Sequence, residues 1–90
     1  MRQATQKPRN IRAEQVQIGD ILKVSWTIED VNYTALGTVT ARDRGTNVTY
    51  FYTKGGVELF KWERGQAYTP HGNLCKLTLC YRADTNIPLF

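Results

Sequence analysis

The chain has 90 residues, with 12 Lys and Arg against 8 Asp and Glu, one His and two Cys. This length makes one domain with a small core, and an apolar content of 41% excludes an intrinsically disordered chain. No apolar run approaches the roughly 20 residues that cross a bilayer, so we expect no membrane partner.

The positive charge is concentrated at the N-terminus. Residues 13–90 carry eight basic and eight acidic side chains, whereas residues 1–12 carry no acidic side chain and four basic ones, namely Arg2, Lys7, Arg9 and Arg12. We therefore expect a flexible basic arm at residues 1–10 ahead of a folded body without net charge. The arm also lacks the apolar stretch of a secretory signal, which favours a cytoplasmic location.

The predicted elements are strands, because β-branched residues are frequent and no window repeats apolar residues at helical spacing. One helical turn is predicted at Ala13–Val16, before the first strand. Gly37 predicts a bend or bulge within the second strand. Turn residues divide the chain into five predicted strands, which are Ile21–Ile28, Tyr33–Arg42, Val48–Thr53, Val57–Trp62 and Leu74–Tyr81.

Five short strands with no helix between them predict an all-β fold, a small and strongly bent barrel over residues 11–82 with at most one short helical turn. An OB-fold fits less well, because it commonly has a helix where this chain has a Gly-Gly turn. Residues 83–90 form an apolar C-terminal tail, which we expect to pack on a surface. The predicted core residues are Leu22, Val24, Trp26, Val39, Phe51, Leu59, Leu77 and Leu79.

Short motifs occur in the order found in a family of small barrels; they are Ile18–Val24, Gly37–Val39, Tyr50–Tyr52 and Gly55–Leu59. In this order the chain resembles SH3-like and Tudor-like barrels, and it also resembles short proteins of unknown function from actinobacterial phages. It departs from Tudor domains at Thr53, where those domains have an aspartate, so no aromatic cage is carried over. The resemblance implies a five-stranded SH3-like barrel that binds a partner and has no activity of its own.

The predicted hairpin that turns at the Gly-Gly pair carries more aromatic side chains than one face can bury. Successive residues of a strand face opposite sides, so Phe51 cannot share a side with Tyr50 and Tyr52. We expect Phe51 in the core and the two tyrosines on the outer face. A two-residue turn would place Phe51 opposite Phe60, and a three-residue turn would place it opposite Leu59. The sequence leaves both registers open.

The two tyrosines suit the centre of a partner-binding or self-association patch, because each has a rigid apolar ring with a polar tip. Lys54 and Lys61 would give this patch a polar rim. An alternative also stays open, in which the N-terminal arm, the loop at residues 63–73 or the C-terminal tail covers Tyr50 and Tyr52.

Side chains for catalysis or metal binding are few. His71 lies in a predicted surface turn without an orienting partner. Cys75 and Cys80 lie five residues apart in one predicted strand and face opposite sides, which argues against a disulfide and a shared zinc site. Glu29 and Asp30 are expected to form a turn. The sequence therefore predicts no enzyme, no cofactor, no metal and no small-molecule substrate.

These observations favour a non-enzymatic interaction module. With the resemblance, the expected protein is a small phage-encoded one that binds a host protein in the host cytoplasm. The alternative is a small RNA- or DNA-binding barrel, for which the neutral body leaves most of the phosphate binding to the arm. Its expected contacts are Arg2, Lys7, Arg9, Arg12, Arg42 and Arg44.

Overall fold

A computed structural model of the chain describes residues 7–82. Short strands make up most of this range, which confirms the all-β class. The strands are β1 (Arg9–Ile11), β2 (Ile21–Ile28), β3 (Val31–Thr38), β4 (Ala41–Arg44), β5 (Val48–Thr53), β6 (Val57–Glu63), β7 (Gln66–Tyr68) and β8 (Lys76–Tyr81), and the 3-10 turns are η1 (Ala13–Gln15) and η2 (Lys54–Gly56). No helix in the described range is long and apolar enough to cross a membrane.

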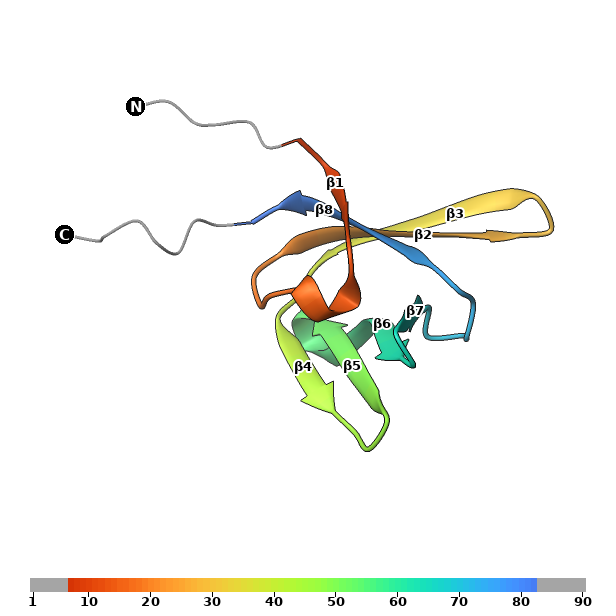
Figure 1. The fold of residues 1–90 in the computed structure, drawn as a ribbon. Coiled ribbons are helices and arrows are strands. Elements are labelled where there is room, and N and C mark those ends of the chain that lie inside the picture. The colour runs from red at the N-terminus through yellow and green to blue at the C-terminus, as the bar shows by residue number, and fades with distance from the viewer. Residues whose placement is uncertain (1–6, 83–90) are drawn as a thin grey trace, which may run out of the picture.

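The strands form two four-stranded antiparallel sheets, sheet 1 with the order β1-β8-β2-β3 and sheet 2 with the order β4-β5-β6-β7 (Figure 1). This differs from the single five-stranded barrel that we expected. The predicted second strand is divided into β3 and β4, because the Val39 N–H donates to the carbonyl oxygen of Asp20 and the Thr40 N–H donates to that of Tyr52. The chain changes sheets between those two hydrogen bonds.

Two further strands lie where the sequence predicted none. β1 pairs with β8, with Arg9 opposite Leu79, so the expected boundary of the N-terminal arm at residue 10 falls inside a strand. β7 pairs with β6 inside the segment expected to be a loop at residues 63–73. Both strands have three residues, which is too short for alternation of apolar and polar residues to reveal them. The expected tail at residues 83–90 lies outside the described residues.

The core lies between the two sheets. Seven of the eight predicted core residues are buried, and Trp26 is half-buried at the edge of the cluster. The prediction missed Phe60, which is fully buried and stacks on Phe51 with ring centroids 4.4 Å apart. It also missed smaller buried side chains, which are Ala13, Val16, Ala67 and Cys75.

The β5–β6 hairpin contains a β-bulge that explains why Phe60 is buried. At its turn Thr53 is opposite Val57, as a three-residue turn requires, but beyond the bulge Phe51 is opposite Phe60, as a two-residue turn requires. Each predicted register therefore holds for one part of the hairpin. The extra residue of the bulge lets Leu59 and Phe60 both point inward, with 7% and 0% of their surface exposed.

A buried ion pair ties the end of β8 to the loop before β2. The Arg82 guanidinium donates from Nε to Asp20 Oδ1 (2.9 Å) and from Nη2 to Asp20 Oδ2 (2.8 Å). Nη2 also donates to the carbonyl oxygen of Gln15, 2.9 Å away. The Asp20 side chain is 1% exposed and accepts a further hydrogen bond from the backbone N–H of Gln17. The carboxylate is thus removed from water and held by several donors.

Candidate interaction site

The tyrosines of β5 lie on the face of sheet 2 that points away from the core. Phe51 is buried as expected, while Tyr50 and Tyr52 are half-buried and their ring centroids lie 6.5 Å apart. Lys61 is directly opposite Tyr50 in the register, so it shares this face. Lys54 lies in the exposed turn η2, away from the other three.

This tyrosine face has mixed charge. Asp43 is opposite Tyr50 and Glu58 is opposite Tyr52, so two carboxylates accompany Lys61 on the same side of the sheet. Partial burial, followed by the charges of Asp43 and Glu58, raises the pKa of the Tyr52 hydroxyl above 10.0. Tyr52 therefore stays protonated at neutral pH and can both donate and accept a hydrogen bond.

A second surface is the inner face of the β2–β3 hairpin, which extends past the strands of sheet 2 (Figure 1). The two strands join through a two-residue turn in which Glu29 and Asp30 both have positive φ, at 49° and 68°. This is the turn type that matches the twist of a hairpin. From here on we call this β2–β3 hairpin the arm and its inner side the arm face; the basic segment expected at residues 1–10 is always called the N-terminal arm.

The arm face carries two apolar cross-strand pairs. Trp26 is opposite Tyr33, and their rings stack with centroids 5.8 Å apart and an interplanar angle of 16°. Ile28 is opposite Val31, and these side chains are 39% and 51% exposed. Alternation along β2 places Trp26 and Ile28 on the same side as the buried Leu22 and Val24, but the strand is longer than the sheet packed beneath it. The sequence did not predict this surface. Alternation shows which side of a strand is apolar, but it does not show where the opposite sheet ends.

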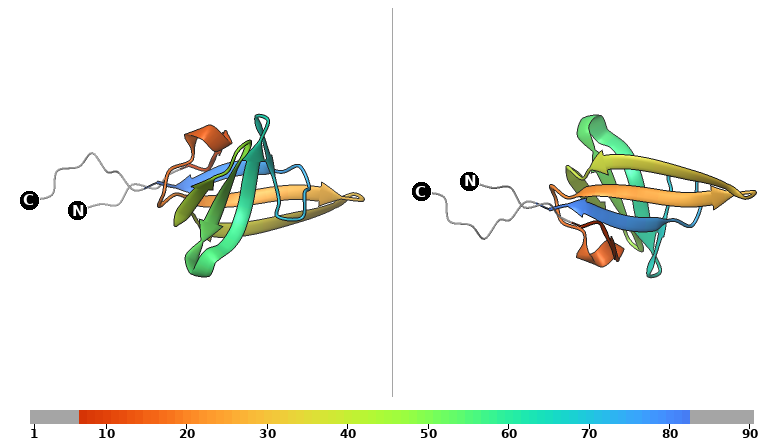
Figure 2. Two further views of the ribbon diagram at one scale, coloured as in Figure 1. Left: turned by 90° about the horizontal axis from the view of Figure 1, so that it is seen from below. Right: turned by 90° about the horizontal axis from the view of Figure 1, so that it is seen from above.

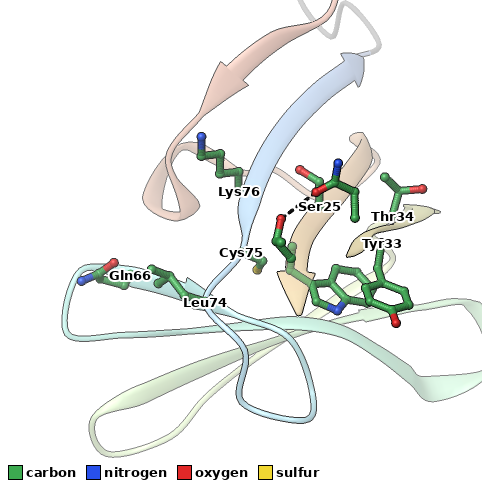
Figure 3. Close-up of a pocket in the computed structure, with 10 residues that line it drawn as sticks. Ser25, Tyr33, Thr34, Gln66, Leu74, Cys75 and Lys76 are labelled. Carbon is green, nitrogen blue, oxygen red and sulfur yellow. Dashed lines mark hydrogen bonds between the residues drawn. The ribbon is translucent and has the colours of Figure 1, made fainter. Parts of the chain in front are cut away.

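A cavity of about 810 Å³ lies beside the arm face, where β8 diverges from β2 (Figure 3). The pairing of β2 with β8 ends at Ser25, and the chain before β8 instead forms a bridge from Leu74 to Tyr68 of β7. Trp26 and Leu74 supply apolar walls to this cavity. Its polar lining residues are Ser25, Thr27, Asn32, Thr34, Gln66 and Lys76.

The side chains considered for catalysis are not brought together. No group of three potential metal ligands occurs within residues 7–82. His71 is exposed, and Cys75 and Cys80 are both free thiols. Burial raises the pKa of the Cys75 thiol from 9.0 to about 11. The Cys75 thiol therefore carries its proton at neutral pH and is a poor nucleophile.

This burial predicts unequal reactivity of the two thiols. In a Cys80→Ser variant, Cys75 is expected to react with a thiol reagent at pH 8 only as fast as the protein unfolds. Since the folded pKa lies above the unfolded one, the contribution of Cys75 to stability is complete below about pH 9 and is lost as the pH rises through about 11. Absorbance of the released chromophore measures the rate, and labelling much faster than unfolding would contradict the burial of Cys75.

The basic residues considered for nucleic acid lie on separate elements. Arg42 and Arg44 lie two residues apart on the exposed strand β4 and share one side of it, while Asp43 faces the other side with Tyr50. Lys7 and Arg9 lie at the start of the described range, and Arg12 forms an ion pair of 3.4 Å with Glu14. Arg2 lies outside the described residues.

The chain matches no protein-family model, and searches of curated proteins and of solved structures give no match. The resemblance to SH3-like barrels and to phage proteins therefore stays a prediction.

Proposed function

We propose that the chain is a non-enzymatic interaction module that binds another protein through the arm face. The observation that carries this proposal is the pair of exposed side chains Ile28 and Val31, which continue the Trp26–Tyr33 stack beyond sheet 2. Leu74, 58% exposed, lies across the neighbouring cavity and extends the same apolar surface.

Burial of this surface offers a sizeable gain in free energy. Each large apolar side chain transferred from water contributes roughly 1.5–3 kcal/mol. Trp26 and Tyr33 are of the types that dominate binding energy at interface centres, and their stacked rings lose little freedom on binding. Thr27 and Asn32, joined by a hydrogen bond of 2.8 Å, lie on the opposite side of the same hairpin, so the apolar surface is confined to the arm face.

The topology supports the proposal that this is an SH3-like binding barrel. β2, β3 with β4, β5 and β6 pair in sequence, and β8 returns to pair with β2. In this proposal β1 and β7 are additions to the five strands. The resemblance to phage proteins suggests a host protein as the partner and the host cytoplasm as the location.

The test is a double substitution that removes apolar surface from the arm face and from the neighbouring cavity without changing β3. Ile28→Ser with Leu74→Ser is expected to abolish capture of the partner from a host lysate, with unchanged circular dichroism, because both side chains are exposed. Tyr50→Ser with Tyr52→Ser is the matched control and is expected to retain capture. The reverse result would move the site to the tyrosine face. If both variants still capture the partner, neither the arm face nor the tyrosine face is the binding site.

Arg42 and Arg44 give a reason to keep nucleic acid as a second candidate. In the sequence Asp43 separates them, but in β4 it faces away, so the two guanidinium groups share a side without it. If phosphate is the ligand, binding of a labelled oligonucleotide should fall steeply with salt. Arg42→Ala with Arg44→Ala should then reduce that slope by about one for each phosphate that the protein no longer neutralises. Binding that changes little with salt would exclude this candidate.

A further inference from the structure

The outer edge of β3 differs from the other outer edges of the two described sheets because it is long and carries no charge. β1, β3, β4 and β7 are the terminal strands of the sheets, so each has one edge that no described strand pairs with. β1 and β7 have three residues, and β4 has four, three of them charged. Short length and charge are the usual protections of an edge against further pairing. β3 has eight residues, and neither a charge nor a proline occurs from residue 31 to 41.

The turn of the arm determines which backbone groups of β3 are available. The residues that flank a two-residue turn form a hydrogen-bonded pair, here Ile28 with Val31. Since hydrogen bonds alternate along an antiparallel pair, the odd-numbered residues of β3 bond to β2. The N–H and C=O groups of the even-numbered residues are directed to the open edge. These residues are Asn32, Thr34, Leu36 and Thr38, and all four are exposed.

We infer that this edge pairs with β3 of a second copy of the chain, which joins sheet 1 of both copies into one antiparallel sheet. The inference concerns the backbone edge of β3 and stands apart from the arm face of the proposed function. A two-fold axis through Thr34 makes the interface self-complementary, because each strand presents the same residues to the other. Thr34 then lies opposite Thr34 of the second copy, a favourable cross-strand pair.

Side-chain size supports a second copy as the occupant. With Thr34 on the axis, Tyr33 lies opposite Ala35 of the second copy, and Val31 lies opposite its Gly37. Each large side chain on the inner face is thus beside a small one. On the outer face Leu36, which is 70% exposed, lies beside Asn32 of the second copy and is removed from water.

Charge supports the same arrangement. In this register Asp30, in the acidic turn of one arm, lies level with Thr38 of the second copy. Within one copy, both views of Figure 2 show the η2 turn projecting beside the C-terminal end of β3, on the side away from β2. A Cβ on Gly37 would lie 2.8 Å from a methyl group of Thr53, so this turn, which holds Lys54, is close to β3. Lys54 of one copy thus lies near the acidic turn of the other.

Residue 34 provides the test, because in this dimer it lies opposite residue 34 of the second copy. Thr34→Lys and Thr34→Glu each place like charges directly opposite one another, and each is expected to weaken the dimer about tenfold. A mixture of the two variants is expected to restore dimers, because Lys then faces Glu. Thr38→Lys is the matched control, since it adds the same charge to the same edge but opposite Asp30, and it is expected to keep the dimer.

Sedimentation equilibrium on the full chain across a wide range of concentration measures these dissociation constants. A monomeric chain at all concentrations would overturn the inference and leave the edge to a strand of another protein. A dimer that is insensitive to charge at residue 34 would also overturn it, by placing the interface elsewhere. Neither outcome would affect the arm-face test, which depends on Ile28 and Leu74.

Discussion

Replacement of Phe60 by Ala is expected to lower the free energy of unfolding by about 3–4 kcal/mol. Phe60 is fully buried between the sheets, and its ring stacks on Phe51 at an interplanar angle of 11°. Removal of the ring loses its transfer free energy and leaves a cavity that the two sheets can close only in part. Urea unfolding followed by tryptophan fluorescence measures the loss.

Trp62→Phe is a useful control for Phe60→Ala. The indole Nε1 of Trp62 is buried, and no residue within 7–82 accepts a hydrogen bond from it. Phe keeps most of the ring area and removes this unpaired donor, so the change in stability should stay below about 1 kcal/mol. If Phe60→Ala costs no more than Trp62→Phe, Phe60 is not at the centre of the core.

Replacement of Arg82 by Ala is expected to lower the free energy of unfolding by about 2–3 kcal/mol. The substitution leaves the carboxylate of Asp20, 1% exposed, buried without its ionic partner. We expect this loss of stability to be smaller than is usual for a broken buried ion pair. The Arg82 side chain is 26% exposed, so water can replace part of its interaction with Asp20. Urea unfolding again provides the measurement.

The double variant Asp20→Ala, Arg82→Ala separates the pair from its parts. It is expected to lose less than the two single variants added together, because no uncompensated charge remains in the double variant. Additive losses would show that the two side chains stabilise the fold independently, and the ion pair would then have no role in holding β8 to the loop before β2.

Much of the fold could be predicted from the sequence because burial and alternation coincide along most strands. Leu22 and Val24 alternate with Lys23 and Ser25, and they are buried as their pattern indicates. The β5–β6 turn and the burial of Phe51 follow from the same reasoning. Where the pattern is interrupted the prediction was incomplete: the bulge at Leu59 buries two successive residues, which a period of two cannot describe, and of these only Leu59 was among the predicted core residues.

The candidate site was less predictable, for two physical reasons. An arm that extends past its opposite sheet has the same alternation as a buried hairpin, so Ile28 gave no signal of exposure. The availability of the β3 edge depends on which strand lies last in the sheet, and this is a property of long-range pairing. The tyrosines of β5 could be assigned to the outer face only because Phe51 between them is better suited to the core.

The pairing of β1 with β8 has a practical consequence for handling the protein. Arg9 lies beside Leu79, so the described chain enters and leaves at the same end of sheet 1. Figure 2 shows the turn of the arm at the opposite end of the molecule. A tether to a sensor chip or bead, attached before residue 7 or after residue 82, therefore starts at the end far from the arm. Immobilisation through either flank leaves the arm directed toward the solution.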